Sequence, residues 1–195
     1  MMKRHDKLLN IQEANLRLED RFLFEQVKNT EQDKTDLSKI IISAGYSNNS
    51  PEYRIAMIIG TQEGWRPGTR SFRNNNPGNL AGIDFKDIDP NVKLEPGKKV
   101  YAQFSSPVLG VKALVEKKIK RWASGKMPIT SGNQQMILQN KGGEKYISGQ
   151  QPTIAQFFYT YAPPNENDTE SYINNFVKGI GGGISRNTKL IDILN

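Results

Sequence analysis

Residues 60–80, GTQEGWRPGTRSFRNNNPGNL, constrain the fold of this chain more than any other stretch. They follow the apolar run EYRIAMII and contain one acid, Glu63. Ser50 and Pro51 precede the run as an N-cap and a first-turn proline, which predicts a helix from Pro51 to about Gly64. Glycine, proline and asparagine dominate the rest of the stretch and predict a tightly turned loop. The sequence thus places Glu63 in the last turn of a core helix, directly before that loop.

The remaining patterns predict a mainly helical α+β domain with one small β-hairpin. Residues 79–85 and 99–106 have the composition of short extended pieces on either side of a turn-rich segment. Three further helices are predicted at residues 106–125, 152–163 and 168–181. Apolar residues spaced along the first of these, from Val108 to Trp122, predict a buried stripe.

Residues 1–45 are predicted to form an N-terminal helical arm and a linker ahead of a domain at residues 46–195. Apolar positions within residues 7–28 are spaced as on a helix, and a polar segment with few apolar residues follows. Two roles remain open for this arm, because it can pack on the domain or dock to a partner.

The chain has no cysteine and one histidine, His5, near the N-terminus. A disulfide framework, a thiolate nucleophile and a cysteine-ligated metal site are therefore excluded. A serine–histidine relay would need the terminus to fold back onto the site. We expect neither a metal nor another cofactor.

The formal net charge of +7 favours an anionic partner. Nucleic acid, an anionic membrane surface and the acidic polymers of a bacterial wall all fit that charge. The basic residues are dispersed and are not gathered into a block with interleaved aromatic residues, so we do not expect nucleic-acid binding.

The sequence pattern also predicts no targeting signal. The N-terminus begins with basic residues but lacks the apolar core of ~7–15 residues that a secretory signal needs, and no apolar run reaches transmembrane length. We expect a soluble protein made in the cytoplasm, without membrane insertion. A target in the cell wall would then be reached through a holin, inside a virion or by a secretion machine.

An acid at a helix end beside a cleft can donate a proton, provided that burial raises its pKa above the ordinary ~4.3. The aliphatic run before Glu63 and the nearby Trp65 could supply an apolar wall. Lysozyme uses a glutamic acid in this way, held neutral against a tryptophan so that it protonates a glycosidic oxygen. The alternative is an ordinary surface glutamate. Asparagine amides in the loop either fix the turn or bind sugar hydroxyl and N-acetyl groups.

Four blocks in this order resemble phage- and prophage-encoded members of the lysozyme-like superfamily, relatives of lytic transglycosylases and glucosaminidases. They are EGW, RNNNPGNL, YAQFSSPVLGVKAL and YAPPNENDTESYINNFVKGIG, and the likeness covers about residues 53–181. The resemblance implies a lysozyme-like domain that cleaves the β-1,4 bond between N-acetylmuramic acid and N-acetylglucosamine in peptidoglycan. Glu63 matches the catalytic acid.

The same resemblance implies substrate-binding roles around the cleft. The loop would shape the cleft floor, the hairpin would form one wall, and the last block would line the opposite side. The residues concerned are Asn76 and Asn79 in the loop, Tyr101 and Phe104 in the hairpin, and Tyr161, Glu166 and Tyr172 in the last block, with Trp65 beside the acid. The last block also has the pattern of an ordinary helix break and restart.

Two reaction types remain open at this point. Most glycosidases use two carboxylates, ~5–5.5 Å or ~6.5–9.5 Å apart, and Asp84 is the best second candidate near the hairpin. A lytic transglycosylase needs one acid, which protonates the leaving oxygen and then accepts the proton of the muramic 6-hydroxyl as an anhydro ring closes. The resemblance favours this second route. The rival class is a non-catalytic wall-binding protein or a virion protein with a lysozyme-like fold, whose arm would contact other virion proteins.

Overall fold

The computed structural model describes residues 34–82, 84–95, 101–132 and 145–195. The chain divides into two units, Met1–Asp36 and Leu37–Asn195, and every element named below belongs to the second. The predicted helix at residues 7–28 lies outside the described residues. The second unit is mainly helical, and its described strands form a two-stranded antiparallel sheet, as predicted. No helix in the described ranges is long and apolar enough to span a membrane.

The second unit begins with helix α2, Leu37–Ser43. Leu37, Ile40 and Ile41 are buried, and α2 packs on helix α3, Pro51–Gln62. Residues 37–43, predicted as part of the arm, therefore contribute to the core of the second unit. The physical reason is that three aliphatic side chains of one helix are covered there.

Helix α3 begins and ends where the sequence predicts. The Ser50 hydroxyl oxygen accepts a hydrogen bond from the Tyr53 amide at 3.1 Å, and Pro51 stands in the first turn. Gly64 adopts a φ of 70°, a left-handed conformation that suits glycine, and the helix stops just before it. Glu63 is consequently the C-cap residue of α3.

A short loop helix that the sequence analysis did not predict follows α3. This helix, α4, Arg70–Arg73, begins at its N-cap Thr69. Phe72 within it is buried and packs on Trp65, with 5.1 Å between ring centroids. The first part of the glycine- and asparagine-rich stretch therefore belongs to the core.

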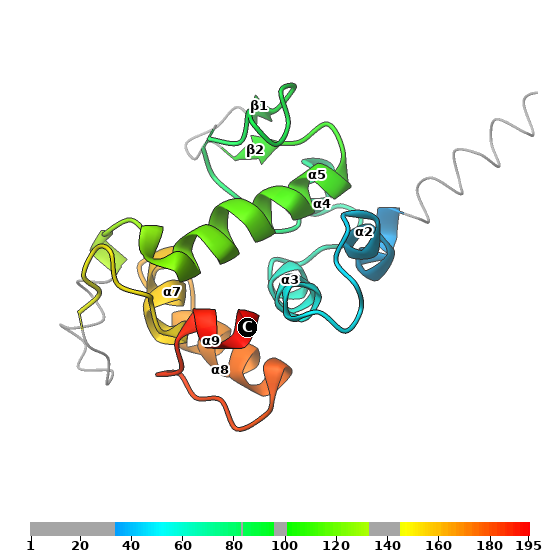
Figure 1. Cartoon of the computed structure of the whole chain (residues 1–195). Coiled ribbons are helices and arrows are strands. Elements are labelled where there is room, and N and C mark those ends of the chain that lie inside the picture. The colour runs from blue at the N-terminus through cyan, green and yellow to red at the C-terminus, as the bar shows by residue number, and fades with distance from the viewer. Residues whose placement is uncertain (1–33, 83, 96–100, 133–144) are drawn as a thin grey trace, which may run out of the picture. The chain divides into compact units, whose positions relative to one another are not determined.

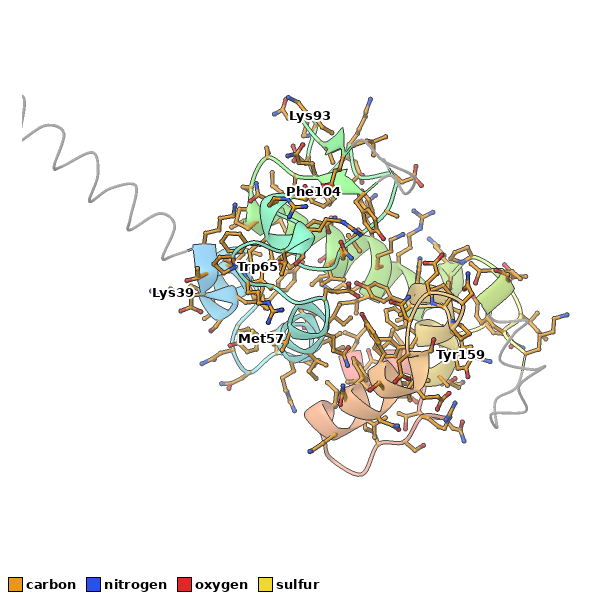
Figure 2. All side chains as sticks on the ribbon, turned by 180° about the vertical axis from the view of Figure 1, so that it is seen from behind. Lys39, Met57, Trp65, Lys93, Phe104 and Tyr159 are labelled. Carbon is orange, nitrogen blue, oxygen red and sulfur yellow. The ribbon has the colours of Figure 1, made fainter. Side chains whose placement is uncertain are left out.

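The β-hairpin consists of strand β1, Lys93–Leu94, paired antiparallel with strand β2, Ala102–Gln103. Lys93 lies opposite Gln103, and Leu94 lies opposite Ala102. Figure 2 shows Lys93 pointing away from the domain, whereas Phe104, just after β2, lies nearer the helices. One strand thus faces solvent, and the other connects to the core.

The first strand predicted for this hairpin is wrong. In the described residues of this segment, 79–82 and 84–85, Ala81 forms one isolated bridge with Tyr101 and no residue lies in a strand. The chain turns at Gly82, whose φ is 94°, and continues through a series of turns in which Phe85 is buried. Phe85 is therefore buried from a turn and not from a strand.

Three helices form the C-terminal part of the unit: α7, Ile154–Tyr161; α8, Thr169–Ile180; and α9, Leu190–Leu194. Helices α7 and α8 lie where they were predicted. Thr153 and Gln156 form a capping box at the start of α7, and Asp168 accepts a hydrogen bond from the Ser171 amide at the start of α8. Helix α8 packs on both α3 and α7.

The helix predicted at residues 106–125 is continuous as far as Ser124, is broken at Gly125, whose φ is 90°, and crosses the middle of the unit. It comprises α5, Pro107–Lys112, followed by two segments with π-type hydrogen bonding, η1, Ala113–Lys120, and η2, Trp122–Lys126. The hairpin lies on one side of it and α8 and α9 lie on the other (Figure 1). Its segments contact α2, α3 and α9. The predicted stripe is confirmed, since most of its apolar side chains are buried.

Side-chain amides tie the asparagine-rich loop to the hairpin. Asn76 is fully buried, and its Nδ2 donates to the carbonyl oxygens of Leu80 at 3.0 Å and Ala102 at 2.8 Å. Its Oδ1 accepts a hydrogen bond from the Leu80 amide at 2.8 Å. Asn75 Nδ2 donates to the Phe104 carbonyl oxygen at 2.9 Å. The loop is therefore fixed against β2 by backbone partners on both sides.

Helix α5 packs on this loop through Gly110. A Cβ atom at that position would lie 2.0 Å from the Asn75 carbonyl oxygen and 2.9 Å from Pro77 Cδ. Because the loop is held by the asparagine hydrogen bonds, its backbone has little room to give way. Glycine is therefore needed where helix and loop approach each other.

We predict that Gly110→Ala lowers the free energy of unfolding by roughly 1–3 kcal/mol, the cost of overpacking, although alanine normally favours a helix over glycine. Urea unfolding followed by the fluorescence of the buried Trp65 and Trp122 measures the change. Gly179→Ala in α8 is the matched control, because a Cβ there meets the flexible end of the Ile58 side chain. Equal stability of the two variants would contradict the close contact.

Candidate active site

A cavity of about 380 Å³ lies where α3, the asparagine-rich loop, the long helix and α7 meet. Segments far apart in the sequence supply its wall. These are residues 78–81 of the loop, residues 160–162 and 166–167 at and after the end of α7, and four single side chains, Glu63, Tyr101, Lys118 and Trp122. The cavity is open to solvent on one side and is lined by both polar and apolar groups.

The backbone of Glu63 is held on both sides. Its amide donates to the Ile59 carbonyl oxygen at 2.8 Å, which completes the last turn of α3. Its carbonyl oxygen accepts a hydrogen bond from the Ser71 hydroxyl at 3.2 Å. The side chain therefore projects into the cavity from a fixed point, and its Oε1 accepts a hydrogen bond from the Tyr172 hydroxyl at 3.1 Å.

Burial raises the pKa of the Glu63 carboxyl from 4.5 to about 7. The hydrogen bond from Tyr172 and the nearby Asn79 amide oppose this rise, because both stabilise the charged form. The positive charge of Arg70 also lowers the pKa of Glu63, by less than either of these two groups does. Burial prevails, so near neutral pH this carboxyl exists in both protonation states and can give or take a proton.

Tyr172, in α8, is positioned by residues of α3 and α7. Its backbone carbonyl oxygen accepts a hydrogen bond from Gln62 Nε2 at 3.1 Å, and its ring packs on Phe158 with 6.0 Å between centroids. Burial, together with the negative charge of Glu63, raises the pKa of the Tyr172 hydroxyl. The hydroxyl therefore stays protonated and remains a donor to the carboxyl.

Four of the side chains predicted for substrate binding line the cavity with Glu63. They are Asn79, Tyr101, Tyr161 and Glu166. The Tyr161 hydroxyl donates to the Gly78 carbonyl oxygen, so it also holds the loop in place. Asn79 Oδ1 is buried and has no hydrogen-bond partner among the described residues. That oxygen is therefore available to accept a hydrogen bond from a ligand.

Three predicted site residues are placed elsewhere. Trp65 packs in the core against Phe72, and Phe104 packs against Phe85 with 5.5 Å between centroids. Asn76 makes its hydrogen bonds to backbone groups and does not line the cavity. Their influence on the cavity is indirect, through the positions of the loop and the hairpin.

The predicted second carboxylate, Asp84, lines a neighbouring pocket and not the cavity that contains Glu63. The other hairpin acids have structural partners: Asp89 is buried and accepts hydrogen bonds from two backbone amides, and Glu95 pairs with Arg70 at 3.7 Å. Among the described residues, Glu166 is the carboxylate that shares the cavity wall with Glu63.

Two cavity residues were not predicted as site residues, although a sequence signal existed for them. Lys118 and Trp122 are four residues apart and so lie on one face of the long helix. Lys118 Nζ lies 4.8 Å from the centroid of the Trp122 ring. The sequence patterns placed Trp122 in the buried stripe and Lys118 among the dispersed basic residues, and the face that they share also opens on the cavity.

Comparisons with known proteins add no assignment. A scan against protein-family models, a search of curated proteins and a search of solved structures each gave no significant match. In the described part of the chain, no group of three or more histidine, aspartate or glutamate side chains could hold a metal ion. The function is therefore inferred from the cavity itself and from the sequence motifs whose residues meet there.

The raised pKa of Glu63 predicts a pH-dependent cost to stability. The folded state binds this proton more tightly than the unfolded state, so the contribution to stability is full below pH ~4.5 and is lost as the pH rises to about 7. Glu63→Gln removes the titrating group. We therefore expect the variant to gain up to about 3 kcal/mol over the wild type between pH 4.5 and pH 8 in urea unfolding.

Two tyrosine variants locate the cause of this effect. Tyr172→Phe removes a donor to the charged form, so the pKa of Glu63 should rise further and the loss of stability should extend to higher pH. Tyr53→Phe is the matched control, because it removes a hydroxyl that donates to Ser38 at the other end of α3. A pH profile shared by wild type, Tyr172→Phe and Glu63→Gln would contradict the assignment.

Proposed function

We propose that this chain is a peptidoglycan-cleaving glycosidase with a lysozyme-like domain, and that it acts as a lytic transglycosylase. Its substrate would be the β-1,4 bond between N-acetylmuramic acid and N-acetylglucosamine, and Glu63 would be the catalytic acid. The observation that carries the proposal is the Glu63 carboxyl in the cavity wall, with a pKa raised by burial to about 7. The motifs favour a phage- or prophage-encoded lytic protein that acts on the bacterial wall.

The distribution of the four sequence blocks supports this proposal. Each block contributes at least one side chain to the same cavity: Glu63 from the first, Asn79 from the second, Tyr101 from the third, and Tyr161 and Glu166 from the last. Residues that resemble a glycosidase family in sequence thus come together around one acid. If the likeness of the four blocks were due to chance, their side chains would not be expected to line the same cavity.

The proposed reaction uses Glu63 twice. The protonated carboxyl first donates to the glycosidic oxygen of the leaving sugar as the bond to the anomeric carbon of the muramic acid breaks. The carboxylate then accepts the proton of the muramic 6-hydroxyl, whose oxygen attacks that carbon and closes a 1,6-anhydro ring. No water is consumed, and Glu63 ends in its protonated state. A pKa near 7 suits a group that must act first as an acid and then as a base.

Neighbouring groups support both steps. The Tyr172 hydroxyl donates to Oε1 of Glu63, and this hydrogen bond stabilises the carboxylate formed in the first step. Asn79 Oδ1, buried and without a partner among the described residues, can accept a hydrogen bond from a sugar hydroxyl or an N-acetyl N–H. Arg70 lies 4.1 Å from the centroid of the Tyr101 ring and supports that wall of the cavity.

Hydrolysis is the second candidate reaction, because Glu166 lines the same cavity as Glu63. In that reaction the second carboxylate would activate water or form a covalent intermediate. The two reactions give products that differ in mass by one water molecule.

Glu63→Gln is expected to lower the release of soluble fragments from purified peptidoglycan by about 10²-fold or more, since the general acid is lost. Fold retention is checked by circular dichroism. Glu52→Gln, the same substitution in the first turn of α3, is the control and should leave the rate unchanged. Full activity of Glu63→Gln would overturn the proposal. Binding of the wild-type protein to the wall without release of sugar would favour a non-catalytic wall-binding or virion protein.

Mass spectrometry of the released fragments distinguishes the two reactions. Anhydro-muramic ends are expected from the wild-type protein, and Glu166→Gln should slow their release without changing their mass. If the wild-type protein instead releases reducing muramic ends, and these are not released by Glu166→Gln, the reaction is hydrolysis with two carboxylates.

A further inference from the structure

A second pocket adjoins the cavity that contains Glu63. Its volume is about 290 Å³, and it lies between the long helix and residues 84–85, 126–128 and 148. Lys118 and Trp122 line both spaces, so the two share a wall. A ligand that occupies the cavity would therefore lie next to this pocket.

The pocket carries an excess of positive charge. Lys117, Lys118, Arg121 and Lys126 line it, opposed by the Asp84 carboxylate. Lys117 also pairs with Asp87 outside the pocket. Within the described ranges, the other three cations form no ion pair with a carboxylate. Unpaired cations beside a concave surface attract an anion.

Lys118 stands at the junction of the two spaces and is partly buried. Its Nζ lies near the rings of Trp122, at 4.8 Å, and Phe85, at 5.6 Å. Burial lowers the pKa of its ammonium group, and the nearby charge of Asp84 partly offsets that effect. A cation that has lost part of its hydration gains more from an anionic ligand than an exposed lysine does.

The pocket also has an apolar part, which narrows the kind of anion that fits. Phe85, Trp122, Met127 and Pro128 line it next to the cations. A short peptide presents methyl groups and free carboxylates together, whereas a phosphodiester polymer is charged and polar throughout. In peptidoglycan, such a peptide is attached to each muramic acid, beside the bond that Glu63 would cleave.

We propose that this second pocket is an anion-binding subsite for a free carboxylate of the stem peptide carried by the glycan strand. The inference rests on the proposed function, because it takes the glycan in the cavity as given. The pocket would then make cleavage depend on the peptide, and strands without stem peptides would be poorer substrates.

The test compares peptide-bearing glycan strands with strands stripped of peptides by an amidase. In Arg121→Gln/Lys126→Gln, the ratio of the two cleavage rates, peptide-bearing over stripped, should fall about threefold or more, as the loss of two charge contacts from exposed side chains implies. Lys178→Gln/Lys189→Gln removes the same charge from exposed positions outside the pocket and should leave the ratio unchanged. Equal falls on both substrates would overturn the proposal.

A binding measurement separates this inference from the cleavage reaction. Glu63→Gln protein is titrated with a disaccharide–tetrapeptide and with the same compound amidated at its carboxyl groups. Tighter binding of the free acid, lost in the triple variant that adds Arg121→Gln and Lys126→Gln, supports the subsite even if the wild type cleaves no glycan. Equal binding of the two compounds overturns it even if cleavage is robust. If inorganic phosphate binds the pocket and the free-acid compound does not compete with it there, the pocket prefers wall phosphate, and this result also overturns the proposal.

Discussion

The buried side chain of Asn76 holds together the segments that form the cavity. Its side-chain amide forms hydrogen bonds with the backbone of Leu80, within the loop, and of Ala102, in strand β2. With the loop fixed in this way, helix α5 packs closely on it at Gly110, and the residues after the loop's turn face the end of α3. The position of the cavity wall opposite Glu63 therefore depends on one amide whose hydrogen bonds all go to the backbone.

Within that frame, the chemistry follows from competition between burial and hydrogen bonding at one carboxyl. Burial favours the neutral acid, whereas Tyr172, Asn79 and Arg70 favour the carboxylate. Burial is the larger effect, but the opposing groups keep the pKa near 7 and not far above it. The group can therefore change its protonation state during a reaction at neutral pH, which a fully buried acid without partners could not do.

Local signals in the sequence predicted α3, the long helix, α7 and α8, because caps and prolines act through neighbouring residues, whereas α4 and α9 were not predicted. Ser50, Ser106 and Thr153 each precede a helix that begins where expected. The hairpin and the site were harder, since they depend on contacts between distant segments. Phe85, predicted in an extended segment, is buried in a turn, and Trp65 and Phe104 fill the core instead of the cavity. The spacing of Lys118 and Trp122 places them on one helix face, but only the packing of that helix shows that this face lines the cavity.

The proposed chemistry requires the pKa of the Glu63 carboxyl to lie near 7, so that both protonation states are populated at neutral pH. Carbon-13 NMR of protein labelled at the glutamate carboxyl groups measures this directly, with Glu63→Gln used to assign the signal. The account predicts an apparent pKa near 7, well above the ordinary glutamate value of 4.5. A Glu63 signal that titrates at about 4.5, as a solvent-exposed glutamate does, would contradict it.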